Sequence, residues 1–122
     1  MAVAVVVLTG CGLCSNQIVK EVPSPDGTKK AIIFVRDCGA TTGFSTDVSV
    51  INANETLPSS AGNVFIADAN HGGVPLAKNN ALDVNAVWTS ANRLVIHYPA
   101  GARNFLQDPA RAGVAIQYLP RK

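Results

Sequence analysis

The feature that most constrains the fold of this chain is residues 28–37, a strand signal that is apolar on both faces. Its middle is the unbroken run Ile-Ile-Phe-Val at residues 32–35. A half-buried strand alternates apolar and polar side chains, whereas a strand covered on both sides is apolar throughout. The preceding Ser-Pro-Asp-Gly at residues 24–27 is a turn sequence, because Pro presets φ, Asp bonds nearby backbone and Gly supplies a positive φ. We therefore expect a turn followed by a strand that other segments cover on both faces.

Shorter segments with strand character recur along the chain. The predicted strands cover residues 18–22, 28–37, 45–51, 63–68, 84–88, 93–98 and 113–119. Residues 84–88 and 93–98 form a predicted hairpin, with Trp88 as a core anchor. Residues 69–82 are irregular and can hold a short turn of helix. Residues 105–111 are ambiguous and could form one helical turn that stops near Pro109. We predict an all-β domain, an antiparallel sandwich or a curled meander of about seven short strands.

Composition narrows the possible functions. The chain of 122 residues suits one domain, and its 48% hydrophobic content argues against disorder. The 10 basic and 8 acidic residues are scattered, so nucleic acid is not an expected partner. No apolar run reaches the ~20 residues of a membrane-spanning helix. We predict no cofactor and no metal.

The N-terminus carries a short apolar run at residues 2–8, followed by Thr9, Gly10 and Cys11. The run is too short to span a bilayer, but it has the length of a signal-peptide core. Leu-Thr-Gly-Cys at residues 8–11 resembles the lipobox of bacterial lipoproteins, although no Lys or Arg precedes the apolar run. The alternative is a first β-strand, because the run is rich in valine.

The lipobox resemblance implies a division of the chain. Residues 1–10 would be a signal peptide, residues 11–17 a lipid anchor and spacer, and residues 18–122 a single β domain. Cys11 would be the lipidated cysteine. Gly12, which follows it, carries no inner-membrane retention signal, so the resemblance implies an outer-membrane location facing the periplasm.

The three cysteines then take different roles. With Cys11 lipidated, Cys14 and Cys38 are left to pair as a disulfide in an oxidising compartment. The competing interpretation is a C-x-x-C motif at residues 11–14 for redox chemistry or zinc. Redox use favours a helix after the motif and zinc needs a second ligand pair, and the sequence offers neither.

The whole chain resembles one group, the small bacterial lipoproteins of uncharacterised function. The residues that carry this resemblance are the lipobox, the turn at residues 24–27, the segment Arg-Asp-Cys-Gly-Ala-Thr-Thr-Gly-Phe-Ser-Thr at residues 36–46 and the late hairpin. The resemblance implies a membrane-anchored envelope protein. It supplies no activity.

The best candidate for a ligand or partner loop is the hydroxyl-rich segment that contains Thr41, Thr42, Ser45 and Thr46. Hydroxyls and free backbone N–H groups can hold an anion or a sugar. The alternative, which we favour, is that they bond their own loop backbone. Phe44, within the same segment, is predicted to fill the core.

Two further patterns are weak indications of a calcium site and of a catalytic triad. Residues 68–72, Asp-Ala-Asn-His-Gly, resemble the start of a calcium loop, but position 79 is Asn instead of the acidic ligand. An Asx-type turn explains these residues more simply. His71 or His97 could join Asp37, Asp47 or Asp68 in a hydrolytic triad, yet no G-x-S-x-G elbow is present.

These observations support three functional hypotheses. The first is a non-catalytic, lipid-anchored envelope protein with a binding or structural role toward an envelope protein or the cell wall. The second is a periplasmic inhibitor of an enzyme such as lysozyme, using residues 41–46 or 69–82 as its inserted loop. A small hydrolase is the third.

Overall fold

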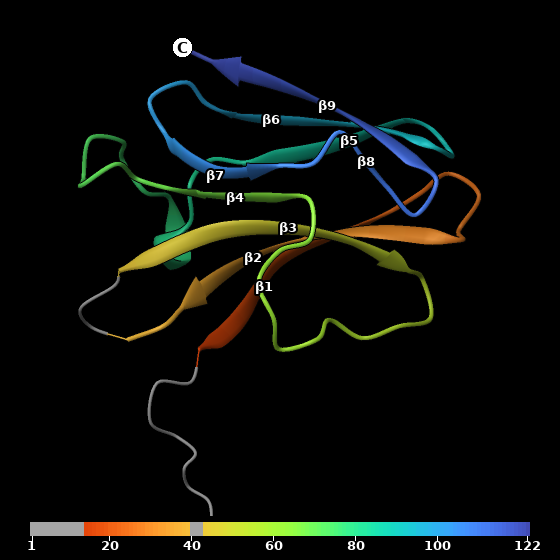
Figure 1. The fold of residues 1–122 in the computed structure, drawn as a ribbon, viewed down its shortest axis with the longest axis horizontal. Coiled ribbons are helices and arrows are strands. Elements are labelled where there is room, and N and C mark those ends of the chain that lie inside the picture. The colour runs from red at the N-terminus through yellow and green to blue at the C-terminus, as the bar shows by residue number, and fades with distance from the viewer. Residues whose placement is uncertain (1–13, 40–42) are drawn as a thin grey trace, which may run out of the picture.

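The computed structural model describes residues 14–39 and 43–122, and it is a sandwich of two β-sheets (Figure 1). The first sheet has the order β1-β2-β3-β4-β7 and the second β5-β6-β9-β8. The strands are β1 (Ser15–Pro23), β2 (Lys29–Asp37), β3 (Phe44–Asn52), β4 (Phe65–Asp68), β5 (Asn85–Ser90), β6 (Arg93–Pro99), β7 (Arg103–Gln107), β8 (Ala110–Arg111) and β9 (Val114–Arg121). The all-β prediction is confirmed, and of its two forms the structure adopts the sandwich.

One strand pair departs from the antiparallel expectation. β6 and β9 run parallel, with Arg93 opposite Ala115 and His97 opposite Leu119. Parallel neighbours need a crossover connection. Here the chain leaves β6, crosses to the first sheet as β7, and returns through β8 to β9.

The predicted helical turn at residues 105–111 is wrong, because this segment contributes β7 and β8. The described residues therefore form nine strands. Pairing of β7 with β4 decides the conformation, which the local pattern left ambiguous. β1 begins at Ser15, so residues 15–17, predicted as spacer, already belong to the sheet. The short helical turn expected within residues 69–82 is present as the 3₁₀ segment η2 (Lys78–Asn80).

The core lies between the two sheets and draws side chains from both. Buried members from the first sheet include Ile33, Val48 and Phe65, and those from the second include Leu94 and Ile96. Phe65 also contacts the rings of Tyr98 and Tyr118, with centroids 5.6 and 6.0 Å away. Alternation along each strand places these residues on the inner faces.

The outer face of β2 is covered as well, which confirms the prediction from its apolar run. Ile32 and Phe34 are buried and lie opposite Ser49 and Asp47 of β3. The connection between β3 and β4 crosses this face (Figure 1). The backbone N–H of Gly62, in that connection, donates to Asp47 Oδ2 at 2.8 Å.

Trp88 anchors one sheet to the other instead of filling the centre of the core. It is half-buried on β5, and its Nε1 donates to the carbonyl oxygen of Val22 in β1 at 2.8 Å. The ring therefore joins edge strands of the two sheets.

Candidate functional site

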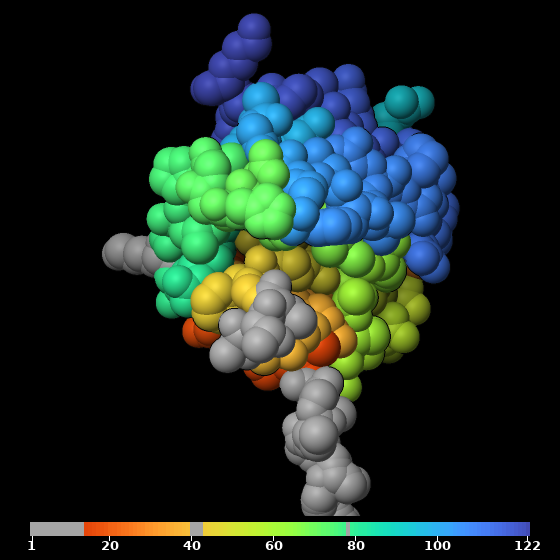
Figure 2. Space-filling view, turned by 60° about the vertical axis from the view of Figure 1, so that its left-hand side comes forward, coloured from red at the N-terminus to blue at the C-terminus, as the bar shows by residue number. Residues whose placement is uncertain are grey.

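Two adjoining cavities open at the end of the sandwich where β2 ends and β3 begins. They measure about 320 and 230 Å³ and share Gly43, Phe44, Asp68 and Arg103 in their walls. Figure 2 looks toward this end, where the orange and yellow ends of β2 and β3 lie below the blue β7. We call the group Arg36, Phe44, Asp68, Arg103 and Phe105 the Phe44–Phe105 surface.

Two phenylalanines are unusually exposed on this surface. Phe105 keeps 58% of its surface accessible and Phe44 keeps 41%. Phe44 pairs with Asp37 at the last register position of β2 and β3, beyond the core, so its predicted role as a core residue is wrong. Phe105 is the extra residue of a bulge in β7, between Leu106 opposite Ile66 and Asn104 opposite Ala67. Bulges redirect side chains, and this one directs an aromatic ring to solvent.

Arg103 is fixed at the centre of the surface by three partners. Its Nη2 and Nε donate to the two carboxylate oxygens of Asp68 at 2.6 and 3.1 Å. Its Nη1 donates to His71 Nε2 at 3.1 Å, and its guanidinium carbon lies 5.0 Å from the centroid of the Phe105 ring. The hydrogen bonds from Arg103 hold the pKa of Asp68 below its usual value, so the carboxylate stays ionised at neutral pH.

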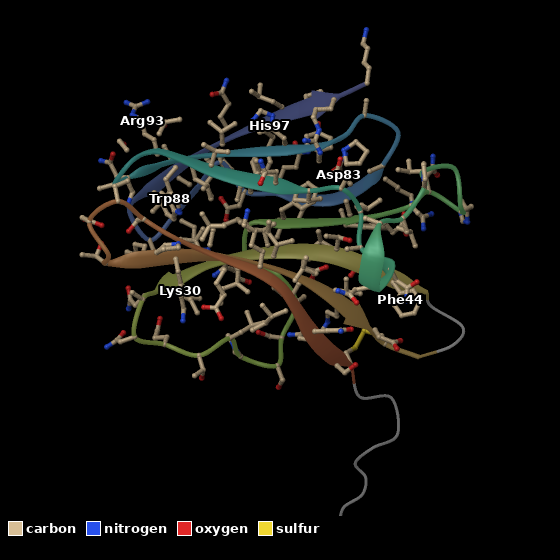
Figure 3. The ribbon with its side chains drawn as sticks, turned by 180° about the vertical axis from the view of Figure 1, so that it is seen from behind. Lys30, Phe44, Asp83, Trp88, Arg93 and His97 are labelled. Carbon is tan, nitrogen blue, oxygen red and sulfur yellow. A yellow bond between two sulfur atoms is a disulfide. The ribbon has the colours of Figure 1, made fainter. Side chains whose placement is uncertain are left out.

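The Cys14–Cys38 disulfide forms as predicted and borders the same surface. The two Cα atoms lie 4.0 Å apart, and Cys38 lines the second cavity together with Arg36 and Phe105. Figure 3 shows the labelled Phe44 beside the sulfur–sulfur bond. The bond closes the open end of the β1–β2 hairpin, where Ser15 pairs with Asp37.

The hydroxyls predicted as a ligand loop are only partly described. Thr41 and Thr42 lie outside the described residues, as do Cys11 and the signal segment at residues 1–10. Thr46 is buried, and its Oγ1 accepts the backbone N–H of Leu82 at 2.8 Å. Ser45 Oγ donates to Asp47 Oδ1 at 2.7 Å. Both described hydroxyls therefore bond within the protein, but their partners are the backbone of Leu82 and the side chain of Asp47 and not the backbone of their own loop.

Asp47 is a fully buried carboxylate below this surface. Burial raises its pKa, while the Gly62 N–H, the Ser45 hydroxyl and the charge of Arg36 oppose that rise. These partners satisfy both carboxylate oxygens. The role of Asp47 is therefore structural, because its carboxylate joins β3 to the connection between β3 and β4.

The histidines lie apart. His97 is on β6 in the second sheet, opposite Asn85, whereas His71 is beside Arg103 at the end of the sandwich. Asp68 and His71 are joined through Arg103, and the hydroxyl of Ser45, which lines the adjoining cavity, bonds Asp47. A nucleophile with its base is therefore not assembled among the described residues that line these cavities.

Residues 68–72 form the Asx-type turn that we preferred to a calcium loop. The backbone N–H of Asn70 donates to Asp68 Oδ1 at 2.9 Å, and Asn70 and His71 both have positive φ. In the described parts of the chain, residues 14–39 and 43–122, no three His, Cys, Asp or Glu side chains come together as metal ligands.

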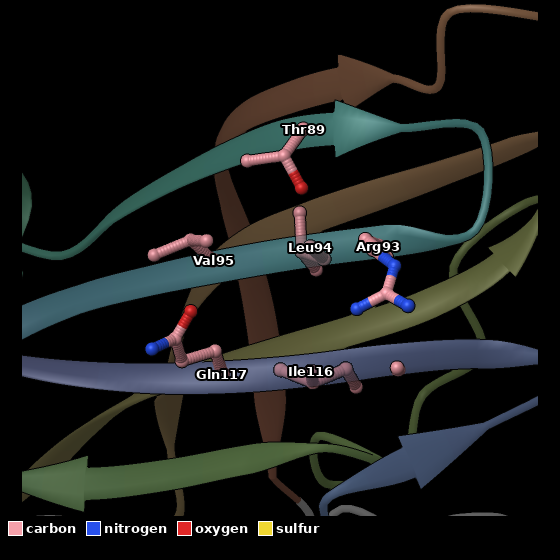
Figure 4. A pocket seen from close by; sticks show the side chains of 7 residues that line it. Thr89, Arg93, Leu94, Val95, Ile116 and Gln117 are labelled. Carbon is pink, nitrogen blue, oxygen red and sulfur yellow. The ribbon is translucent and has the colours of Figure 1, made fainter.

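A further depression lies on the outer face of the second sheet (Figure 4). It measures about 300 Å³, and its side-chain lining includes Thr89, Arg93, Val95 and Gln117. These residues come from β5, β6 and β9, and the exposed Val87 and Leu119 lie on the same strands. The lining contains no acid–base pair.

The sequence analysis missed Arg103 and Phe105, because it left residues 105–111 ambiguous, with one helical turn suggested, and assigned Arg103 to no element. Residues 103–107 run polar, polar, apolar, apolar, polar, so they lack the alternation that would have signalled a strand. The chain was compared with protein families, curated proteins and solved structures, and none matched.

None of the helical segments among the described residues is long and apolar enough to cross a bilayer.

Proposed function

We propose that this chain is a bacterial envelope lipoprotein, anchored through Cys11, whose β-sandwich has a binding or structural role without catalysis. The observation that carries the proposal is the Cys14–Cys38 disulfide. It accounts for two of the three cysteines and leaves Cys11, directly after Leu-Thr-Gly, for lipid.

The disulfide supports export, because such bonds persist mainly in oxidising compartments. A folded domain that begins at Ser15 also agrees with an anchor at Cys11, since few residues separate the two. The proposed location is the outer membrane, facing the periplasm. Several acyl chains hold a protein stably on a bilayer, whereas one chain binds only marginally.

The Phe44–Phe105 surface is the proposed contact region. Exposed aromatic rings and arginines are the side chains that interfaces favour. Both rings keep more than a third of their area accessible, and a fixed arginine lies beside one of them. This chemistry supports binding by surface complementarity.

Metabolic labelling with palmitate tests the anchor. The wild-type chain is expected to take up label, and Cys11→Ala is expected to lose it completely. The double variant Cys14→Ala with Cys38→Ala is the matched control and should keep the label, because it retains Cys11. Equal labelling of wild type and Cys11→Ala would end the anchor proposal.

An enzyme inhibitor is the second candidate. The connection between β4 and η2 favours it, because Leu76 there is 42% exposed and lines the same cavity as Phe44. Inserted inhibitor loops present such apolar side chains. A lysozyme activity assay with the purified chain tests this candidate, with Leu76→Asp as the variant; full lysozyme activity at saturating chain would remove it.

A further inference from the structure

The Phe44–Phe105 surface is placed close to the proposed lipid anchor by covalent geometry. Cys11 precedes Cys14 by three residues, and three residues span at most about 11 Å. Cys14 is bonded to Cys38, and Cys38 lines a cavity with Phe44 and Phe105. A lipid on Cys11 therefore brings this end of the sandwich near the bilayer surface.

The chemistry of the surface suits the boundary between headgroups and acyl chains. Exposed aromatic and aliphatic side chains are buried at that depth by proteins that lie on membranes. Phe105 is the most exposed large apolar residue among the described ones, and Leu76 lines the wall of the first cavity with Phe44. The aliphatic stem of an arginine beside these rings can lie in apolar surroundings while its charged end stays at the level of the headgroups.

Charge alone does not explain the surface. Arg103 is paired with Asp68, and the charge of Arg36 acts on the Asp47 carboxylate beneath the surface. The formal charges of these four groups cancel. Attraction to anionic lipid is therefore weak here, and contact depends on burying the two phenylalanine rings.

We propose that the Phe44–Phe105 surface rests in the interfacial layer of the bilayer and orients the domain on its membrane. This inference rests on the proposed anchoring at Cys11. The domain then presents its second sheet away from the bilayer, since β1 begins on the side of the molecule away from β6 and β9 (Figure 1). The bilayer then takes the place of a protein partner at the Phe44–Phe105 surface, and a protein or cell-wall partner would meet the outer sheet instead.

Fluorescence quenching by brominated lipid tests the contact. In a Trp88→Phe background, Phe105→Trp places a reporter on the surface, and Leu119→Trp is the matched control on the outer face of the second sheet. The full chain is coupled at its Cys11 thiol to a maleimide lipid, with the disulfide kept oxidised. The vesicles contain phosphatidylethanolamine and phosphatidylglycerol with brominated acyl chains.

The reporter at position 105 should shift to shorter wavelength and lose most of its intensity, while the reporter at 119 should be unchanged. Equal quenching at both positions, or at neither, overturns the proposal. The same result is expected in phosphatidylcholine vesicles, because the charges cancel. Quenching that requires phosphatidylglycerol would also overturn it, by showing a charge-driven contact.

The coupled protein separates this inference from the proposed function. If palmitate labelling fails but the reporter at position 105 is still quenched, the anchor proposal fails and the proposed contact of the surface with lipid holds. Successful labelling, with the two reporters alike, would keep the anchor and remove the membrane contact. Urea unfolding of each variant confirms that the reporter sits on a folded domain.

Discussion

Gly62→Ala tests the packing that covers the outer face of β2. A Cβ atom at this position would lie 2.6 Å from the carbonyl oxygen of Phe65 and 2.8 Å from that of Val48. It would also lie 2.9 Å from the Cβ atom of Asp47. Two of these neighbours are backbone atoms of the sheet and cannot rotate away, so the chain at Gly62 must move.

The movement has two costs. Forcing a methyl group into a packed site costs about 1–3 kcal/mol. The displaced N–H also loses its 2.8 Å bond to the buried Asp47 carboxylate, and an unsatisfied buried polar group costs about 1–3 kcal/mol more. The smaller conformational freedom of alanine in the unfolded chain returns only about 0.4–1 kcal/mol. We expect a net loss of about 1–5 kcal/mol in the free energy of unfolding.

Urea unfolding followed by the fluorescence of Trp88 measures this loss. Trp88 is the one tryptophan of the chain, and its bond to Val22 breaks on unfolding. The matched control is Gly101→Ala, where the added Cβ would meet only the Val74 side chain at 3.1 Å. We expect the control to change stability by no more than about 0.5 kcal/mol. A loss below about 1 kcal/mol for Gly62→Ala would refute the argument.

The burial of the Asp47 carboxyl also predicts that the stability of the protein depends on pH. Burial raises the pKa of Asp47 in the folded protein above its value in the unfolded chain. The folded state therefore holds this proton more tightly, so the contribution of Asp47 is most favourable below its unfolded pKa and is lost as pH rises through the raised value. Asp47→Asn should remove this component. If the difference in stability between wild type and Asp47→Asn stays constant across that pH range, the burial argument fails.

Two further predictions concern the links between strands. The double variant Cys14→Ala with Cys38→Ala should lose about 3.5 kcal/mol of unfolding free energy, because the disulfide no longer restricts the unfolded chain. Wild type measured with reductant should unfold at the same urea concentration as the double variant. A clear difference between the two midpoints would contradict the loop-entropy argument. Trp88→Phe should lose about 1 kcal/mol, because it removes the hydrogen bond to Val22 and keeps most of the ring; thermal unfolding by circular dichroism measures it, and unchanged stability would show that this bond contributes nothing.

Much of the local structure could be predicted from the sequence. The turn at residues 24–27 forms as expected: Asp26 Oδ1 accepts the Thr28 N–H at 3.1 Å, and Gly27 has a φ of 74°. The apolar run in β2 correctly indicated a strand covered on both faces. The Cys14–Cys38 bond was predicted by setting Cys11 aside for the lipobox, and the bond is present. The turn and the buried strand depend only on neighbouring residues.

The candidate site could not be found this way. Its members come from β2, β3, β4 and β7, and no local pattern relates Phe44 to Phe105. Phe44 was expected in the core because it is large and apolar, and its exposure depends on where the β2–β3 pairing ends. Phe105 is exposed because a bulge in β7 shifts its register against β4.

The amino-acid sequence by itself determined where most of the strands and turns form, because side-chain periodicity and backbone preference act over a few residues. Only the tertiary structure decided that β6 lies parallel to β9, that Asp47 is buried under Gly62, and that Arg103 lies between Asp68 and Phe105. These contacts join residues that are 15 to more than 30 positions apart or depend on strand register, and they are set by how the two sheets pack.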